Sequence, residues 1–253
     1  MNITTLGTSH GDPTLEHFCT STLLETQGRY YLIDAGEPAN ALLVRQGLRS
    51  AQLSAIFITH MHIDHTGSLP VVCEQADKYR RNFPELFLTV CLPEQEAIEP
   101  LHAWRRANHN RFNNPSNVFR HYDQDNGYQD EALAMTAVRT RHLNIKDEPN
   151  AASYAIKIAA EGKNVLFTGD LAKDFGDFPL EQAQHCDLVF SEITHYPLEM
   201  AIPTLEKLNC GKLVFYHIHN PWQTEEGRNK ALQACSHLPY PVEFAFDGYK
   251  TSI

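Results

Sequence analysis

The sequence contains no uninterrupted apolar stretch near the roughly 20 residues that a membrane-spanning helix needs. Its first residues also lack the basic and then apolar pattern of a secretory signal, so we expect a cytoplasmic protein with no membrane partner. Basic residues are outnumbered, 21 against 31 acidic ones, and the net charge of −10 gives the surface as a whole no attraction for nucleic-acid phosphates. Any contact with RNA would therefore be local.

Cysteine pairs of the Cys-x-x-Cys type are absent, although the chain has six cysteines. Several stand inside apolar runs, as Cys91 does between Val90 and Leu92. We expect buried thiols, and neither a disulfide framework nor a cysteine zinc site. The chain also has no internal repeat at a fixed spacing and no low-complexity tract. With 253 residues, we expect one domain spanning 1–253.

Short runs with strand character recur along the chain, and helical patterns interrupt them in two batches. Strands are expected at residues 3–6, 20–25, 29–33, 55–59, 86–92, 133–140, 152–159, 165–168, 188–191, 213–216 and 242–246. Helices are expected at residues 39–47, 68–81, 94–111, 197–209 and 224–234. This order predicts an α/β protein with an αββα layer arrangement, in which two packed sheets have helices outside.

The segment at about 93–130 is the least regular part and is expected to be an inserted helix and loop. A solvated surface excursion and a lid over the substrate are both open for it. A lid could bring cationic and stacking side chains to a phosphate-containing substrate. The candidates are Trp104, Arg105, Arg106, Arg111 and Phe112, and a solvated helix face with one buried aromatic is the alternative.

Histidine is abundant, with 14 residues, and four potential metal ligands crowd into residues 60–65. They are His60, His62, Asp64 and His65, directly after an apolar strand and before a helix. Burying these side chains without partners would cost several kcal/mol at worst, and a bound cation removes that cost. His60 and His62 share one side of an extended backbone, while Asp64 and His65 fall where the chain turns, so each pair can hold one ion.

Two metal ions need more ligands, because hydrolytic sites use about three protein ligands per ion and leave a position for water. Asp170 ends the apolar strand at 165–168 in a Thr-Gly-Asp turn and is suited to bridge two cations. His142 and His217 also stand at strand ends, and His219 follows His217 two positions later. Singly, such histidines are more often core or loop residues, but their repeated placement at strand ends favours metal binding.

Taken together, these residues resemble the metallo-β-lactamase superfamily, whose His-x-His-x-Asp-His signature is matched without departure at 60–65. The later signature positions are matched in order by His142, Asp170 and His217, so the resemblance covers nearly the whole chain. The Asp-x-Gly of the superfamily is matched by Asp34 and Gly36. The resemblance implies a sandwich of two mixed β-sheets flanked by helices.

The resemblance also implies how the ligands divide between two metals. His60, His62 and His142 would hold the first ion, Asp64, His65 and His217 the second, and Asp170 would bridge them. Oxidoreductase members of the superfamily carry a glutamate at the position of His62 and an aspartate at that of His65. This chain has neither, which favours hydrolysis.

Within the superfamily, the opening Leu-Gly-Thr-Ser at 6–9 and the Gly-Ser-Leu-Pro at 67–70 look like the ribonuclease Z and phosphodiesterase branch. That branch has His-Glu-Ala-Thr where this chain has Ser-Glu-Ile-Thr at 191–194, so its usual donor histidine is missing. His195, in the same loop, is our first candidate for the proton donor, and His219 is the second. Glu192 could orient a donor by accepting its other N–H. No long arm resembling the one that grips tRNA is recognised.

These features predict a metal-dependent hydrolase that uses a metal-bridging hydroxide, with a small or cyclic nucleotide-like phosphodiester as substrate. Asp64, His195, His219 and Glu192 are the expected participants in catalysis. The cofactors would be two divalent ions, zinc or alternatively manganese or iron. Hydrolysis of a thioester, lactone or other carbonyl compound, an RNA-processing nuclease, and a non-enzymatic metal-binding scaffold are the alternatives. The oligomeric state is open, a homodimer included.

Overall fold

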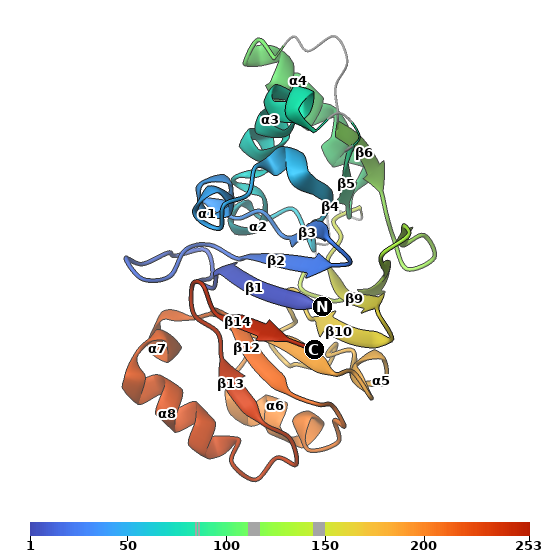
Figure 1. The fold of residues 1–253 in the computed structure, drawn as a ribbon. Helices are drawn as coiled ribbons and strands as arrows, with labels where there is room; N and C mark the ends of the chain where they lie inside the picture. The colour runs from blue at the N-terminus through green and yellow to red at the C-terminus, as the bar shows by residue number, and fades with distance from the viewer. Residues whose placement is uncertain (84, 86, 111–116, 144–149) are drawn as a thin grey trace.

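The chain folds into two β-sheets that pack face to face, as Figure 1 shows for the computed structural model. The structure describes residues 1–253 except 84, 86, 111–116 and 144–149. Within that part of the chain the first sheet has, in spatial order, β14 (Lys250–Ser252), β1 (Asn2–Gly7), β2 (Ser21–Thr26), β3 (Arg29–Ile33), β4 (Leu53–Phe57), β5 (Leu88–Leu92) and β6 (Asn117–His121). The second has β13 (Val242–Phe244), β12 (Leu213–Ile218), β11 (Leu188–Ile193), β10 (Lys163–Phe167), β9 (Tyr154–Ala160), β8 (Ala134–Arg139) and β7 (Tyr128–Gln129).

The central core lies between the two sheets. Tyr31 and Phe57 of the first sheet meet Ile156, Phe167 and Phe190 of the second, and all five side chains are fully buried. Aromatic rings give this layer much of its apolar area, and the Phe167 and Phe190 rings stack with centroids 4.8 Å apart. Burial of this layer is the main favourable contribution to joining the sheets.

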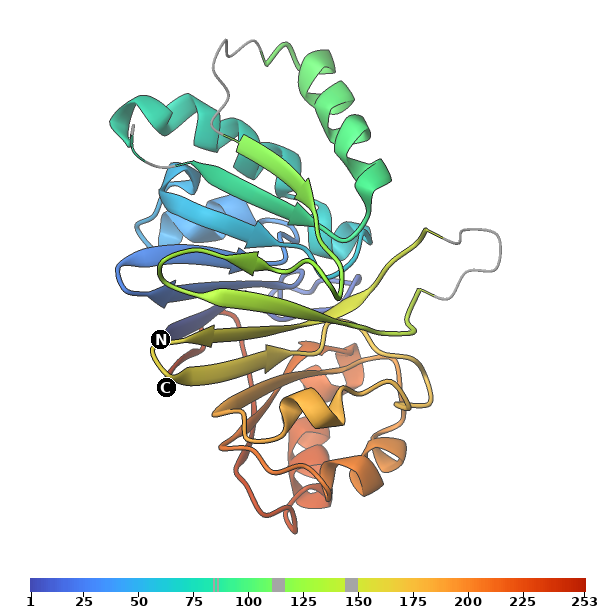
Figure 2. The same ribbon diagram turned by 90° about the vertical axis from the view of Figure 1, so that its right-hand side faces the viewer.

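Helices cover the outer face of each sheet. They are α1 (Ala39–Arg45), α2 (Ile63–Thr66), α3 (Leu69–Tyr79), α4 (Ile98–Ala107), α5 (Leu180–Ala183), α6 (Leu198–Leu205), α7 (Asn220–Gln223) and α8 (Glu225–Ala234), with short turns η1 (Ser50–Gln52), η2 (Arg80–Asn82) and η3 (Gln95–Ala97). Buried residues of α1 and α3 pack on the first sheet, and those of α6 and α8 pack on the second. The expected αββα arrangement is therefore confirmed, and Figure 2 shows its layers after a quarter turn.

Each sheet is mixed, and most of the candidate ligands follow strands of its parallel half, whereas His142 follows β8, which pairs antiparallel with β7 and β9. Strands β3 to β6 run parallel in the first sheet, and β10 to β13 run parallel in the second. In α/β structures, the loops after the carboxyl ends of parallel strands form the usual binding crevice. The candidate ligands at 60–65 and Asp170 follow β4 and β10, and His217 lies at the end of β12.

The segment at 93–130 contains strands as well as the expected helix. The segment at 93–130 contains α4, which ends at Ala107 within the expected helix, and it also supplies the edge strands β6 and β7. Residues 111–116 lie outside the described part.

Five cysteines are buried and Cys210 is half-buried, and all six are free thiols, as expected. No helix among the described residues has the length and apolar character to cross a membrane.

Candidate metal centre

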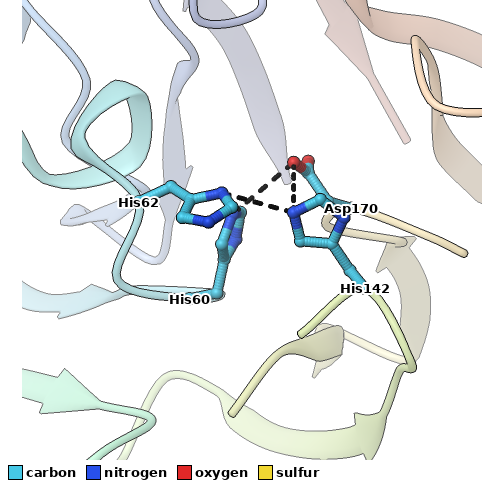
Figure 3. Close-up of side chains that lie close together, drawn as sticks. All are labelled: His60, His62, His142 and Asp170. Atoms are coloured by element: carbon cyan, nitrogen blue, oxygen red, sulfur yellow. Dashed lines mark hydrogen bonds and ion pairs between the residues drawn. The ribbon is translucent and has the colours of Figure 1, made fainter. Parts of the chain in front are cut away.

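The structure brings the scattered candidate ligands together at one edge of the sandwich. Although His142 is 77 or more residues from the motif at 60–65, its Nε2 lies 3.2 Å from Nδ1 of His62. Asp170 Oδ2 lies 3.5 Å from Nε2 of His60 and 3.6 Å from Nε2 of His142. Figure 3 shows these four side chains turned toward a common point. This group is called the first cluster.

A second cluster of Asp64, His65 and His217 lies beside the first. The Nε2 atoms of His65 and His217 face each other at 3.2 Å, and Oδ2 of Asp64 lies 3.3 Å from Nε2 of His217. Oδ1 of Asp170 lies 3.4 Å from Nε2 of His65 and 3.5 Å from Nε2 of His217. Oδ2 of Asp170 thus faces the first cluster, and Oδ1 faces the second.

The donor atoms are spaced like the ligands of a metal ion. Atoms bonded to a tetrahedral zinc at about 2.0–2.1 Å are about 3.3 Å from one another, close to the spacings in both clusters. Moreover, Nε2 of His60 and Oδ1 of Asp170 are buried without a hydrogen-bond partner among the described residues. Buried polar atoms without partners are costly, so their convergence fits cation ligands better than a packed polar core.

Asp34 orients His65 from behind. Its Oδ2 accepts a hydrogen bond from Nδ1 of His65 at 2.8 Å, and its Oδ1 accepts one from the backbone N–H of Thr59, also at 2.8 Å. A carboxylate only accepts, so Nδ1 of His65 carries a proton, and Nε2 is the nitrogen that faces the cluster as the potential ligand. The sequence shows Asp34 as part of an Asp-x-Gly motif but indicates no role for it, because its partner His65 is 31 residues away.

The backbone is shaped to present two of these side chains. Gly169 has φ +56°, and a Cβ there would lie 2.6 Å from the carbonyl oxygen of Tyr154, so the turn before Asp170 requires glycine. His217 has φ 49° and sits where the register between β11 and β12 shifts. A bulge of this kind turns one side chain out of the strand's alternation, here toward the second cluster.

The protonation states suit metal binding. Burial, with repulsion from His65, holds the pKa of His60 well below its usual range, so this imidazole is neutral. Burial alone would raise the pKa of Asp170, but His217, His65 and His60 outweigh it and hold the pKa well below the usual range. For Asp64, a hydrogen bond to His217 and the charge of His65 likewise outweigh burial and lower the pKa. Burial lowers the pKa of His65, but the charges of Asp170 and Asp34 outweigh it and raise the pKa well above the usual range. The clusters therefore combine ionised carboxylates with a neutral His60 and with a His65 that would give up its Nε2 proton on binding a cation.

His195 faces the first cluster from the loop after β11. Its Nε2 lies 3.7 Å from Oδ2 of Asp170, and its Nδ1 lies 3.0 Å from Oε1 of Glu192. Burial lowers the pKa of His195, but the hydrogen bond and the charge of Glu192 outweigh it and raise the pKa to about 9. Glu192 is itself buried and accepts the backbone N–H groups of Leu171, Thr194 and His195, which fixes its position.

The other sequence candidates lie farther from this geometry. The exposed His219 makes no side-chain hydrogen bond to another described residue, and its ring lies edge-on to His10, with centroids 5.1 Å apart. In α4, Arg105 pairs with Asp77, and Arg106 pairs with Glu99. Both guanidinium groups are therefore paired with carboxylates of α3 and α4. Arg111 and Phe112 lie outside the described residues.

His10 is a component that the sequence did not single out. It lies in the loop between β1 and β2, with its ring edge-on to that of His217 at 6.5 Å between centroids. Burial lowers its pKa, a hydrogen bond to Asn220 opposes that effect, and repulsion from His217 and His219 adds to it. In the sequence, only the high number of histidines indicated that the site could have further members.

The two mixed sheets, the outer helices and the ligand cluster define a protein of the metallo-β-lactamase fold class. The solved structures agree, since the metallo-β-lactamase fold protein YhfI of Bacillus subtilis superposes with a TM-score of 0.77 at 16% identity, over 99% of both chains. Residues 1–228 match the family described as anti-Pycsar protein Apyc1, and the chain belongs to that family.

Further similarities are to proteins named as a tRNase Z, a diphosphatase and ribonucleases Z. The short form of human tRNase Z superposes with a TM-score of 0.74 at 19% identity, over 100% of this chain and 99% of that one. A diphosphatase of the PhnP family superposes with a TM-score of 0.72 at 17% identity, over 100% and 97%. In sequence, ribonuclease Z of Pseudomonas putida is 41% identical over 95 residues, which are 36% of this chain and 30% of the relative. Ribonuclease Z of Prochlorococcus marinus subsp. pastoris is 44% identical over 72 residues, or 28% and 23% of the two chains.

The matched segments span less than a third of these curated ribonucleases. The expected resemblance to the metallo-β-lactamase superfamily and its ribonuclease Z branch is confirmed at the level of family and fold.

Proposed function

We propose that this protein is a dinuclear metal-dependent phosphodiesterase that acts on a small or cyclic nucleotide-like phosphodiester. The observation that carries the proposal is the position of Asp170, with one carboxylate oxygen toward each cluster. His60, His62 and His142 would hold one ion, Asp64, His65 and His217 the other, and Asp170 would join both. Two divalent cations, zinc or alternatively manganese or iron, supply Lewis acidity when bound: they lower the pKa of a water and offset charge on phosphoryl oxygens.

His195 is placed to give a proton to the leaving alkoxide. Glu192 keeps Nδ1 of His195 in a hydrogen bond, so Nε2 is the atom that faces Asp170 and that would face a scissile ester held there. A raised pKa keeps this imidazole protonated at neutral pH, which is the state that a general acid needs. The family's usual donor position is occupied here by Ser191 of β11, and His195 would replace it from the loop that follows this strand.

The charge of the chain favours a small substrate over RNA. With a net charge of −10, the surface does not supply the basic groups that a long polyanion requires. An apolar pocket of about 660 Å³ is walled in part by Leu15, Phe18 and Cys19. Its volume suits a small organic molecule.

Gly36 lies between one wall residue of this pocket and the segment that carries Asp64 of the second cluster. A Cβ on Gly36 would lie 2.1 Å from the carbonyl oxygen of Asp64 and 2.8 Å from Cβ of Cys19, so one glycine separates the pocket wall from the ligand segment.

Hydrolysis of a thioester, lactone or other carbonyl compound is the second candidate, because the same metal chemistry and the same proton donor would serve it. A metal-binding scaffold without turnover is the third. His195 argues against the scaffold, since a carrier has no use for a protonated histidine held against a bridging carboxylate.

A substrate panel with metal-loaded protein separates these functions. The panel contains a 3′,5′-cyclic nucleotide, bis(p-nitrophenyl) phosphate, a thioester and a lactone. We expect turnover of the two diesters that is lost in Asp170→Ala and kept in Asp123→Asn, a matched change of an exposed turn carboxylate. Turnover of carbonyl substrates without diester turnover would reject the phosphodiesterase, and no turnover at all would favour the scaffold.

A further inference from the structure

The loop between β1 and β2 reaches over the second cluster. A Cβ placed on Gly11 would lie 3.5 Å from Oδ2 of Asp64, so the backbone of Gly11 passes against a candidate ligand. The preceding residue, His10, has its ring edge-on to His217. A substrate whose phosphate is held by the two clusters therefore has this loop as a neighbour on the side of Asp64 and His217.

A chain of hydrogen bonds fixes the tautomer of His10. Nδ2 of Asn220 donates to Oδ2 of Asp12 at 2.8 Å, and because a carboxylate only accepts, the amide nitrogen of Asn220 must be on that side. The amide oxygen therefore faces Nε2 of His10 at 3.0 Å and accepts from it. The proton of a neutral His10 thus resides on Nε2, and Nδ1 carries a lone pair.

Nδ1 of His10 has no hydrogen bond to any residue in the described part of the chain. A lone pair repels the oxygens of a phosphodiester, which carry no proton, so a substrate group that pairs with Nδ1 must be a hydrogen-bond donor. In a 3′,5′-cyclic ribonucleotide the donor closest to the phosphate is the 2′-hydroxyl, which is vicinal to the esterified 3′ oxygen. Hydroxyl and N–H donors of a base lie farther away.

We propose that Nδ1 of His10 accepts a hydrogen bond from the ribose 2′-hydroxyl and so makes the protein select ribonucleotides over 2′-deoxyribonucleotides. This inference rests on the proposed phosphodiesterase function. Asp12 and Asn220 act as positioning residues, because they set the tautomer of His10 without reaching the substrate. The edge-on ring of His219 packs against His10 and restricts its rotation.

The test compares a 3′,5′-cyclic ribonucleotide with its 2′-deoxy analogue, which has the same base. A hydrogen bond of ordinary strength predicts about a tenfold preference of the wild type for the ribonucleotide in kcat/KM. His10→Ala should lower kcat/KM for the ribonucleotide about tenfold and leave the deoxy analogue unchanged. His10→Asn, whose Oδ1 can stand near the place of Nδ1, should restore part of the preference.

Two outcomes would overturn the inference, and they are distinguishable. If His10→Ala lowers both cyclic substrates equally, or if the wild type hydrolyses both at one rate, His10 does not read the hydroxyl, although the phosphodiesterase stands. If the wild type hydrolyses bis(p-nitrophenyl) phosphate but neither cyclic nucleotide, both this inference and the cyclic substrate are wrong.

A second readout does not depend on turnover. Long-range ¹H–¹⁵N spectra of the histidine rings should show His10 as the Nε2–H tautomer in the wild type, and a mixture of tautomers in Asn220→Leu. A His10 signal from the Nδ1–H tautomer in the wild type would contradict the hydrogen-bond chain. Metal content measured on the same samples should be equal, since neither residue belongs to the ligand clusters.

Discussion

Asp34 and His65 form a fully buried pair in which the carboxylate accepts the Nδ1 proton of the imidazole at 2.8 Å. The consequence lies on the far side of the ring, where Nε2 faces Nε2 of His217 at 3.2 Å. Asp34 thereby determines which nitrogen of His65 is available as a ligand.

Asp34→Asn should weaken metal binding at the second cluster by about 10- to 100-fold. The asparagine oxygen would still accept from Thr59, which leaves its amide to donate toward His65 and moves the imidazole proton to Nε2, where it blocks the ligand lone pair. Competition with a chromogenic chelator measures the two affinities separately. Asp123→Asn is the control, and an unaltered second affinity in Asp34→Asn would show that the tautomer is not set by this contact.

Metal should stabilise the fold, because the clusters form only in the native state. At a free metal concentration 100 times the Kd, the expected gain is about 2.7 kcal/mol per site. Differential scanning calorimetry should therefore show a higher Tm with zinc and a lower one after chelation. In Asp170→Ala, which removes the residue shared by both clusters, most of this gain should vanish. An equal zinc-dependent shift in the variant would argue against a bridging carboxylate.

His195→Ala should lower kcat by about 10²- to 10⁴-fold on a diester with an alkoxide leaving group, because that group needs a proton. On bis(p-nitrophenyl) phosphate the loss should be small, since p-nitrophenolate leaves without protonation. Comparing the two substrates separates a proton donor from a structural residue. His219→Ala tests the second sequence candidate, and the same substrate-dependent loss in that variant alone would transfer the role to His219.

Glu192→Gln should move the alkaline limb of the kcat profile to lower pH. The carboxylate raises the pKa of His195 to about 9, and a donor works only below its pKa, so activity falls as pH rises through that value. A neutral amide removes the opposing charge and lets burial lower the pKa. Profiles of kcat against pH for the wild type and for Glu192→Gln measure the displacement of the alkaline limb. A limb that stays in place would exclude His195 as the titrating donor.

Asp130 should make the free energy of unfolding decrease in acid. Its carboxylate accepts from Tyr31, Tyr128 and the backbone N–H groups of Ala132 and Leu133. Burial opposes ionisation, but these hydrogen bonds outweigh it and lower the pKa. Because the folded pKa lies below the unfolded value, the stabilisation is complete above about pH 4 and is lost as pH falls through the folded pKa.

Asp130→Asn should therefore destabilise the protein by about 1–3 kcal/mol at pH 7, with a smaller difference near pH 3. Urea unfolding at the two pH values measures it. The neighbouring Glu131→Gln is the control, since its exposed ion pair with Arg29 contributes less than about 1 kcal/mol. A loss in Asp130→Asn that is the same at both pH values would mean that charge is not the cause.

The sequence predicted the fold and the convergence of the candidate ligands because their signals are local and repeated. Apolar strands ending in histidine or aspartate indicate a shared sheet edge, and that rule placed His142, Asp170 and His217 together. The edge strands β6 and β7 were not predicted, because their runs are short and partly exposed, so they lack the apolar pattern of central strands.

Roles that depend on an unrelated segment could not be predicted. Asp34 orients His65, which lies 31 residues away, and His10 depends for its tautomer on Asn220, which lies 210 residues away. The same limit applies to Arg105. The sequence made it a candidate for binding substrate, but in the structure it pairs with the buried carboxylate of Asp77.

The most direct test of the central claim is anomalous diffraction at the zinc edge from crystals of the zinc-loaded protein. The account predicts two peaks, one among His60, His62 and His142 and one among Asp64, His65 and His217, with Asp170 in contact with both. A single peak, or peaks away from Asp170, would contradict it.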